Sequence, residues 1–174
     1  MDGMDLLRLE HIRILAIADG LAAIARRSTP GNPLDLFRLR GDLRRALLVH
    51  LAREDWVVYP RLLASSRPDV HALAGRLVGE AAAFSAAFQA YGRKWTTASI
   101  EADWPGFRNE TLAILAQLRQ RIRVEDHELY PLVDDADQDP GPRHAGTPLP
   151  RAIGRDCVSL HAPAINRRAA AETR

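Results

Sequence analysis

A seven-residue motif occurs twice in the chain and constrains the fold more than any other sequence feature. Residues 54–60 read E-D-W-V-V-Y-P and residues 125–131 read E-D-H-E-L-Y-P, so both follow E-D-x-x-[VL]-Y-P at an offset of 71 residues. The segments ahead of the motifs match more weakly at an offset of 70, where Glu10 corresponds to Glu80 and His11 to Ala81. We interpret the two copies as a duplicated helical hairpin, which predicts a pseudo-twofold axis.

Hydrophobic periodicity indicates helices in both copies, because apolar residues recur at helical spacing and no segment shows the sustained alternation of a strand. Turn-forming residues near positions 28–33, 66–69 and 103–105 divide this pattern. They leave predicted helices over residues 5–27, 33–64, 69–97 and 103–135. Long helices joined by short turns favour antiparallel neighbours. We therefore predict an all-α fold, an antiparallel up-down four-helix bundle.

The sequence also predicts several details of these helices. Asn32 and Pro33 form an N-cap and N1 pair. Pro60 and Pro131 each remove a backbone N–H from a helix and should kink it. Aromatic residues at helical positions are expected to pack in the core; they are Trp56, Tyr59, Trp95, Trp104 and Tyr130. The predicted buried side of the first helix consists of Leu6, Leu9, Ile12, Ile14, Leu15, Ile17, Leu21 and Ile24.

Composition changes after the predicted bundle, which spans residues 1–137. Residues 138–174 are rich in Pro, Gly and Arg, so we expect a flexible tail there. This tail carries six Arg and three acidic residues, and it accounts for the formal net charge of +2. Cys157, the single cysteine, also lies in it and excludes an intrachain disulfide. The bundle shows no basic stripe with interleaved aromatics, so no nucleic acid partner is expected.

The remaining class predictions rest on patterns that the sequence lacks. Its first ten residues lack the basic and apolar regions of a signal peptide, and no apolar window is long enough to span a membrane. We therefore expect a cytoplasmic protein without a membrane partner. The chain has no nucleophile with a base at readable spacing, no phosphate-binding loop and no dinucleotide fingerprint, so we expect that it is not an enzyme.

The residues just ahead of each motif carry the candidate chemistry. His50 and Glu54 are four residues apart on a predicted helix and therefore project from one face, as do Arg121 and Glu125. An imidazole and a carboxylate arranged in this way can bind one metal ion or two neighbouring ones. Helical bundles build such sites from inward side chains on facing helices.

On these residues the chain resembles the hemerythrin-like HHE family. The second and fourth helices of that family each carry H-x-x-x-E followed by x-x-x-[LV]-[FY]-P, and its first and third helices each supply a His. The resemblance covers residues 5–135. It implies an antiparallel four-helix bundle around a non-haem di-iron centre, with roles in oxygen binding, oxygen or redox sensing, nitric oxide responses or iron handling.

Carried over position by position, the resemblance implies a partial ligand set. His11 matches the first-helix His of the family, and His50 with Glu54 matches the second-helix pair. Glu125, or its neighbour Asp126, matches the fourth-helix carboxylate. The predicted metal ligands are therefore His11, His50, Glu54 and Glu125.

The positions of the other family histidines hold residues that cannot bind a metal ion. The third-helix His falls on Ala81 and the fourth-helix His on Arg121, whose guanidinium has no lone pair and a permanent charge. We hypothesise that Arg121 replaces the second metal electrostatically by pairing with Glu54 or Glu125. Glu80, next to the lost third-helix His, is a candidate substitute ligand.

Two functions from different classes are consistent with this pattern. The first is a metal-binding or sensory bundle that holds one iron or another divalent ion, mononuclear rather than di-iron, and whose partner is the metal ion or a small gaseous ligand. The second is a degenerate bundle without metal that acts as a regulatory or protein-interaction module with a protein partner. Ala81 and Arg121 favour loss of the metal, whereas the four predicted ligands favour its retention. We expect His71 and His127 to be exposed.

Overall fold

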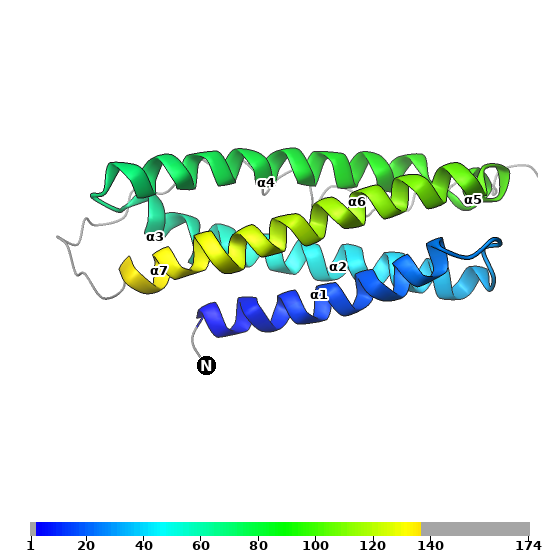
Figure 1. Ribbon diagram of the computed structural model, residues 1–174, viewed down its shortest axis with the longest axis horizontal. Helices are drawn as coiled ribbons and strands as arrows, with labels where there is room; N and C mark the ends of the chain where they lie inside the picture. The colour runs from blue at the N-terminus through cyan, green and yellow to red at the C-terminus, as the bar shows by residue number, and fades with distance from the viewer. Residues whose placement is uncertain (1–2, 137–174) are drawn as a thin grey trace, which may run out of the picture.

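The structure of the protein, a computed structural model, describes residues 3–136 and is all-helical over that range (Figure 1). The long helices are α1 (Gly3–Ala25), α2 (Pro33–Val57), α4 (Pro68–Lys94) and α6 (Trp104–Val124). The short elements are α3 (Tyr59–Leu63), α5 (Thr97–Ala102), the π-helix η1 (Glu125–Leu129) and α7 (Tyr130–Ala136). This confirms the predicted all-α bundle; the predicted tail, residues 138–174, lies outside the described residues.

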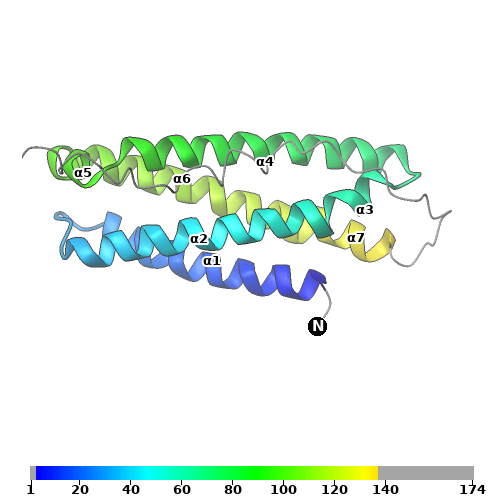
Figure 2. The same cartoon turned by 180° about the vertical axis from the view of Figure 1, so that it is seen from behind.

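The long helices run up and down the same axis. α1 packs against α2 and α6, α4 packs against α6, and α3 packs against α4 and α7. In Figure 1, α6 and α7 lie in front, between α4 and α1. Figure 2 shows the molecule from behind, where α2 faces the viewer. None of the described helices combines the length and apolar character that a bilayer-spanning helix requires.

Side-chain caps begin two of the long helices where the sequence places turn residues. The Asn32 side chain accepts from the amide of Leu34 at 3.0 Å, just after Gly31 takes a positive φ of 68°. The Asp103 side chain accepts from the amide of Gly106 at 2.8 Å. A Cβ atom on Gly106 would lie 2.0 Å from Asp103 Oδ2, so a larger residue there would require the Asp103 carboxylate to shift. These caps satisfy amides that have no partner within the helix.

The two motif prolines interrupt their helices in different ways. In the first copy α2 ends at Val57 and α3 begins at Tyr59, directly before Pro60. In the second copy the chain continues through η1, and the amide of Tyr130 bonds the carbonyl of Glu125. The predicted interruption is confirmed in both copies. The predicted helices over residues 33–64 and 103–135 are present, and each is divided near its proline because a proline cannot donate the hydrogen bond that would continue a regular α-helix.

The core consists of two hydrophobic clusters with a polar layer between them. One cluster includes Ile14, Leu47 and Ile122, and the other includes Leu7 and Val58. The buried polar residues of the layer are His11, His50, Glu54 and Glu125. The clusters on both sides therefore hold these polar side chains in place and keep water away from them.

The predicted buried side of the first helix is partly wrong. Leu9 and Ile12 have exposed fractions of 49% and 66%. The buried face of α1 instead includes His11 and several alanines. The face that the large apolar residues predict is therefore rotated about the helix axis relative to the face that is buried. Trp56 is also exposed, at 84%, and is not a packing residue. The other predicted packing aromatics, Tyr59, Trp95, Trp104 and Tyr130, are buried.

Candidate metal centre

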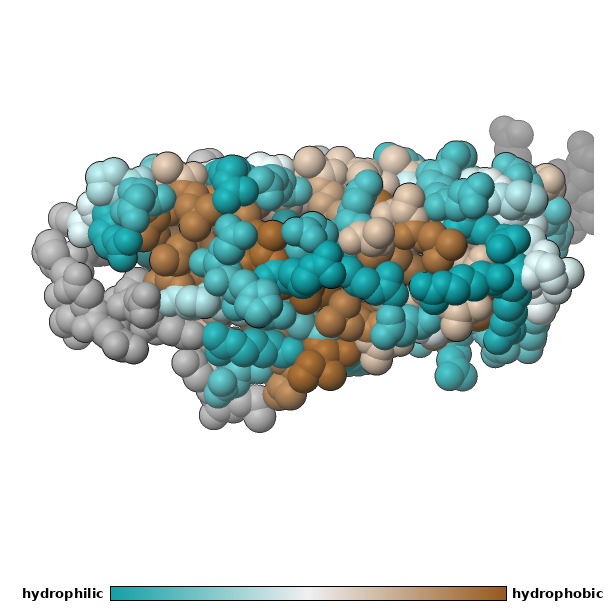
Figure 3. Space-filling model, viewed as in Figure 1, coloured by the Kyte–Doolittle hydropathy of each residue, from teal (hydrophilic) through white to brown (hydrophobic). Residues whose placement is uncertain are grey.

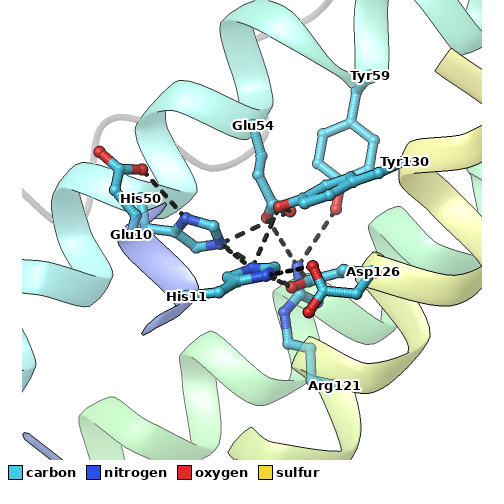
Figure 4. A network of polar contacts seen from close by, with 9 residues as sticks. Glu10, His11, His50, Glu54, Tyr59, Arg121, Asp126 and Tyr130 are labelled. Atoms are coloured by element: carbon cyan, nitrogen blue, oxygen red, sulfur yellow. Dashed lines mark hydrogen bonds and ion pairs between the residues drawn. The ribbon is translucent and has the colours of Figure 1, made fainter. Parts of the chain in front are cut away.

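The predicted metal ligands converge at one buried point of the bundle. His11 projects from α1, and His50 and Glu54 project from α2 (Figure 4). Glu125 is the first residue of η1. One ligand atom from each residue lies within 4.8 Å of all the others. The i, i+4 spacing on α2 places His50 and Glu54 on one face, and the packing of α1 and η1 against that face adds the other two.

Two outer carboxylates orient the histidines toward each other. His11 Nδ1 lies 2.8 Å from Asp126 Oδ1, and His50 Nδ1 lies 3.2 Å from Glu10 Oε2. An ionised carboxylate only accepts hydrogen bonds, so each Nδ1 must carry the hydrogen. The two Nε2 atoms then face the centre of the site and each other, 3.0 Å apart. Carboxylates in this position fix the tautomer and orientation of metal-ligating histidines.

The distances between the ligand atoms fit a divalent cation. His11 Nε2 lies 3.2 Å from Glu125 Oε2, and His50 Nε2 lies 3.8 Å from Glu54 Oε1 and 3.9 Å from Glu125 Oε2. Ligand atoms that each lie about 2.1 Å from one metal ion are roughly 3 to 3.5 Å apart. The site is therefore close to the size that a metal ion needs, with two nitrogen and two oxygen donors suited to Fe(II), Mn(II) or Zn(II).

Glu125 is buried, and within residues 3–136 neither oxygen of its carboxylate accepts a hydrogen bond. Arg121 and His11 approach it closely, but neither directs an N–H along a hydrogen-bond line to it. A buried charge without such bonds is costly unless a cation compensates it. Arg121 compensates Oε1 from one side, so Oε2, which faces the histidines, is the oxygen that fits a bound cation.

Arg121 occupies the other side of the carboxylate pair. Its Nη2 lies 3.0 Å from Glu54 Oε2, contacts Glu125 Oε1 and donates to the Tyr59 hydroxyl at 3.3 Å. The remaining oxygens, Glu54 Oε1 and Glu125 Oε2, face the histidines. Each carboxylate thus bridges from the histidine pair to the guanidinium. The ion pairs expected for Arg121 are present with both Glu54 and Glu125.

Tyr130 is a site residue that the sequence interpretation assigned to packing alone. Its hydroxyl donates to Glu54 Oε1 at 3.1 Å and lies 3.2 Å from His11 Nε2, and its ring stacks on that of His11 with centroids 5.3 Å apart. Glu10 was also missed. The repeat itself held the signal for Tyr130, because it retains a Tyr five residues after Glu in both copies.

The pKa values of the two carboxylates shift in opposite directions. Burial, together with the charge of Glu125, raises the pKa of Glu54. Burial acts in the same direction on Glu125, but its contacts with His11 and His50 and the charge of Arg121 outweigh it and lower its pKa to about 2. Burial lowers the pKa of His50, yet Glu125, Glu54 and Glu10 together bring it above its ordinary value. The site therefore favours positive charge near the histidines.

The other candidates lie outside the cluster or at its edge. Glu80 is exposed on α4 and pairs with Arg76 at 2.9 Å, so its prediction as a substitute ligand is wrong: it points away from the buried face that Ala81 occupies. Asp126 reaches the site only through His11. His71 and His127 are exposed, as predicted.

Comparison with known proteins identifies a family over most of the chain. A family model described as the hemerythrin HHE cation binding domain matches residues 2–133. No curated protein and no solved structure matches the chain.

Proposed function

We propose that the chain, which belongs to the hemerythrin HHE cation-binding family, holds one divalent metal ion and serves in sensing or iron handling rather than in catalysis. The metal ligands would be His11, His50, Glu54 and Glu125, and iron is the first candidate for the ion. Arg121 supplies the positive charge that a second ion would otherwise bring to the two carboxylates.

The observation that carries this proposal is the pair of facing Nε2 atoms. With Nδ1 of each ring held by Asp126 or Glu10, two neutral histidines would direct lone pairs at each other across 3.0 Å. Such lone pairs repel unless a cation lies between or beside them. The cation is either a metal ion, as proposed, or a proton on one imidazole, as in a bundle without metal.

The surrounding residues have separate roles in this proposal. Glu10 and Asp126 hold the imidazoles in the ligating orientation, Arg121 balances the carboxylates, and Tyr130 donates to Glu54. When bound, iron would supply one-electron redox chemistry and affinity for small neutral ligands such as dioxygen or nitric oxide. The apolar clusters on both sides exclude water from the site.

The position of the site supports a sensory role. It joins α1 and α2 to η1, because His11 contacts both Asp126 and Tyr130. A change of charge at the centre would alter these contacts, and the chain passes from them into α7 and residues 137–174. A switch of this kind needs a charge change and an element that responds to it. We infer that η1 and α7 are that element.

Metal analysis of the full chain tests the proposal. The protein is stripped with a chelator, supplied with Fe(II) without oxygen, and its metal content and thermal melting are measured. We expect about one iron per chain and a higher melting temperature, because a ligand of the native state stabilises it. His50→Ala should abolish binding, whereas His127→Ala, which removes an exposed histidine outside the site, should leave it unchanged.

The alternative outcomes separate the two hypotheses. Two irons per chain would overturn the role assigned to Arg121. No bound metal, with an unchanged melting temperature, would overturn the metal site and favour the proton-bridged bundle that acts as a protein-interaction module.

A further inference from the structure

A pocket of about 520 Å³ opens between α4 and α6, next to the metal centre. Its walls are mainly apolar, from Leu77, Phe84 and Val124, and the small side chains Ala83 and Ala87 leave the space. Apolar side chains are visible between these helices in Figure 3. Small-molecule sites in proteins have volumes of about 300 to 1,000 Å³ and combine apolar walls with a few polar groups.

Arg121 presents unused donors at the wall of this pocket. Its contacts with Glu54, Tyr59 and Glu125 all use Nη2. Among the described residues, Nε and Nη1 have no hydrogen-bond partner, and neither atom is sealed from solvent. A guanidinium has only donors, so these N–H groups need an acceptor. A molecule in the pocket could supply that acceptor to Arg121 in place of water.

The charges around the pocket select an uncharged molecule. Glu54 and Glu125 already balance the charge of Arg121, and Glu80 and Glu125 both line the pocket. An anion would be repelled by these carboxylates. A cation would face the donors of Arg121 and a largely apolar wall, where desolvation opposes it.

We propose that this pocket binds an uncharged, mainly apolar carbonyl compound small enough for its volume of about 520 Å³, whose oxygen accepts from Nε or Nη1 of Arg121. This goes beyond the proposed metal function and does not require metal. The same guanidinium holds Glu54 and Glu125 through Nη2, so the occupant is one side chain away from the metal centre.

Three ligands of equal shape test the recognition. The full-length, metal-free protein, labelled with ¹⁵N, is titrated with acetophenone, with α-methylstyrene, which replaces the carbonyl oxygen by CH₂, and with benzoate. We expect acetophenone to shift the amide signals of residues that line the pocket and to bind roughly tenfold more tightly than the other two, because only it offers an uncharged acceptor to a charged donor. Equal affinities of the three compounds, or no binding of acetophenone, would overturn the proposal.

Two variants on α4 locate the site. Ala87→Trp fills the pocket and should abolish acetophenone binding. Ala82→Trp places the same side chain at an exposed position of α4 that does not line the pocket, and should leave the affinity unchanged. Binding retained in Ala87→Trp, or lost equally in both variants, would contradict the site. Because the titration uses protein without metal, its outcome does not depend on how many metal ions the chain binds.

Discussion

The two hairpins of the bundle share one sequence motif but contribute differently to the site. The first hairpin, α1 with α2, supplies both histidines and packs closely along its length. The second, α4 with α6, supplies Arg121, and a pocket separates its helices beside the site. The difference shows that the same two carboxylates face a pair of histidines on one side and the guanidinium of Arg121 on the other.

The hairpins also differ in how the backbone passes the motif proline. In the first copy the helix breaks at Val58 and a new helix starts at Tyr59. In the second copy the chain stays helical through η1, where the amide of Tyr130 donates to the carbonyl of Glu125. Residues five apart in an α-helix point about 140° apart. Bonding from i to i+5 brings them onto nearly the same face, and such turns are frequent at functional sites. The π-helix therefore lets Glu125 and Tyr130 reach the same site.

Placing histidines at positions 81 and 121 should remove the difference in metal ligands between the two hairpins. Ala81→His combined with Arg121→His would supply the second half with two imidazoles and free the oxygens of Glu54 and Glu125 that now face Arg121. We expect the metal content to rise from about one to about two ions per chain, as measured by elemental analysis. Arg121→His alone serves as the control and should stay near one; the same content in both variants would break the comparison.

Removing Arg121 should strongly destabilise the metal-free protein. Its side chain is only 12% exposed, and its loss leaves Glu54 and Glu125 without their cation. Arg121→Ala should lower the free energy of unfolding by about 3 to 5 kcal/mol, the usual cost of breaking a buried ion pair. Urea denaturation followed by circular dichroism measures this change.

Arg119 provides the control for that experiment. It pairs with Asp19 at 2.7 Å on the surface of the bundle, so Arg119→Ala should cost less than about 1 kcal/mol. Similar losses for the two arginines would show that Arg121 does not stand in for a metal ion.

The corresponding acids Glu10 and Glu80 should differ in their effect on metal affinity. Glu10 orients His50, whereas Glu80 pairs with Arg76 at the surface. Glu10→Gln should weaken metal binding by about 10- to 100-fold, as loss of a carboxylate behind a ligating histidine commonly does. Competition with a chelator of known affinity measures the change. Glu80→Gln should have no effect, and equal affinities of the two variants would contradict the role of Glu10.

The two motif tyrosines, Tyr59 and Tyr130, should show the smallest difference in their contribution to the free energy of unfolding. Tyr130→Phe removes a buried hydrogen bond to Glu54 and should lower the free energy of unfolding by about 1.5 to 3 kcal/mol. Tyr59→Phe removes a longer bond from Arg121, which keeps its carboxylate partners, and should cost about 0.5 to 1.5 kcal/mol. Both values come from urea denaturation of metal-free protein. A larger loss for Tyr59→Phe would reverse the comparison.

The four residues that meet at the centre were predicted through the family resemblance. The sequence by itself determined the helical fold and the breaks at the turn residues. These features are local, because caps, prolines and i, i+4 pairs act within one helix. The same reasoning misplaced Leu9 and Ile12, since apolar size alone does not show that the buried face of α1 contains His11.

Tertiary structure alone decided which side chains complete the site. The partners of His11, Asp126 and Tyr130, are 115 and 119 positions away, and Glu10 is 40 from His50. Such contacts depend on how the helices pack and on the extra residue in the π-turn, neither of which a local pattern specifies. The pocket beside Arg121 has the same origin, because it exists only where α4 and α6 face each other through small side chains.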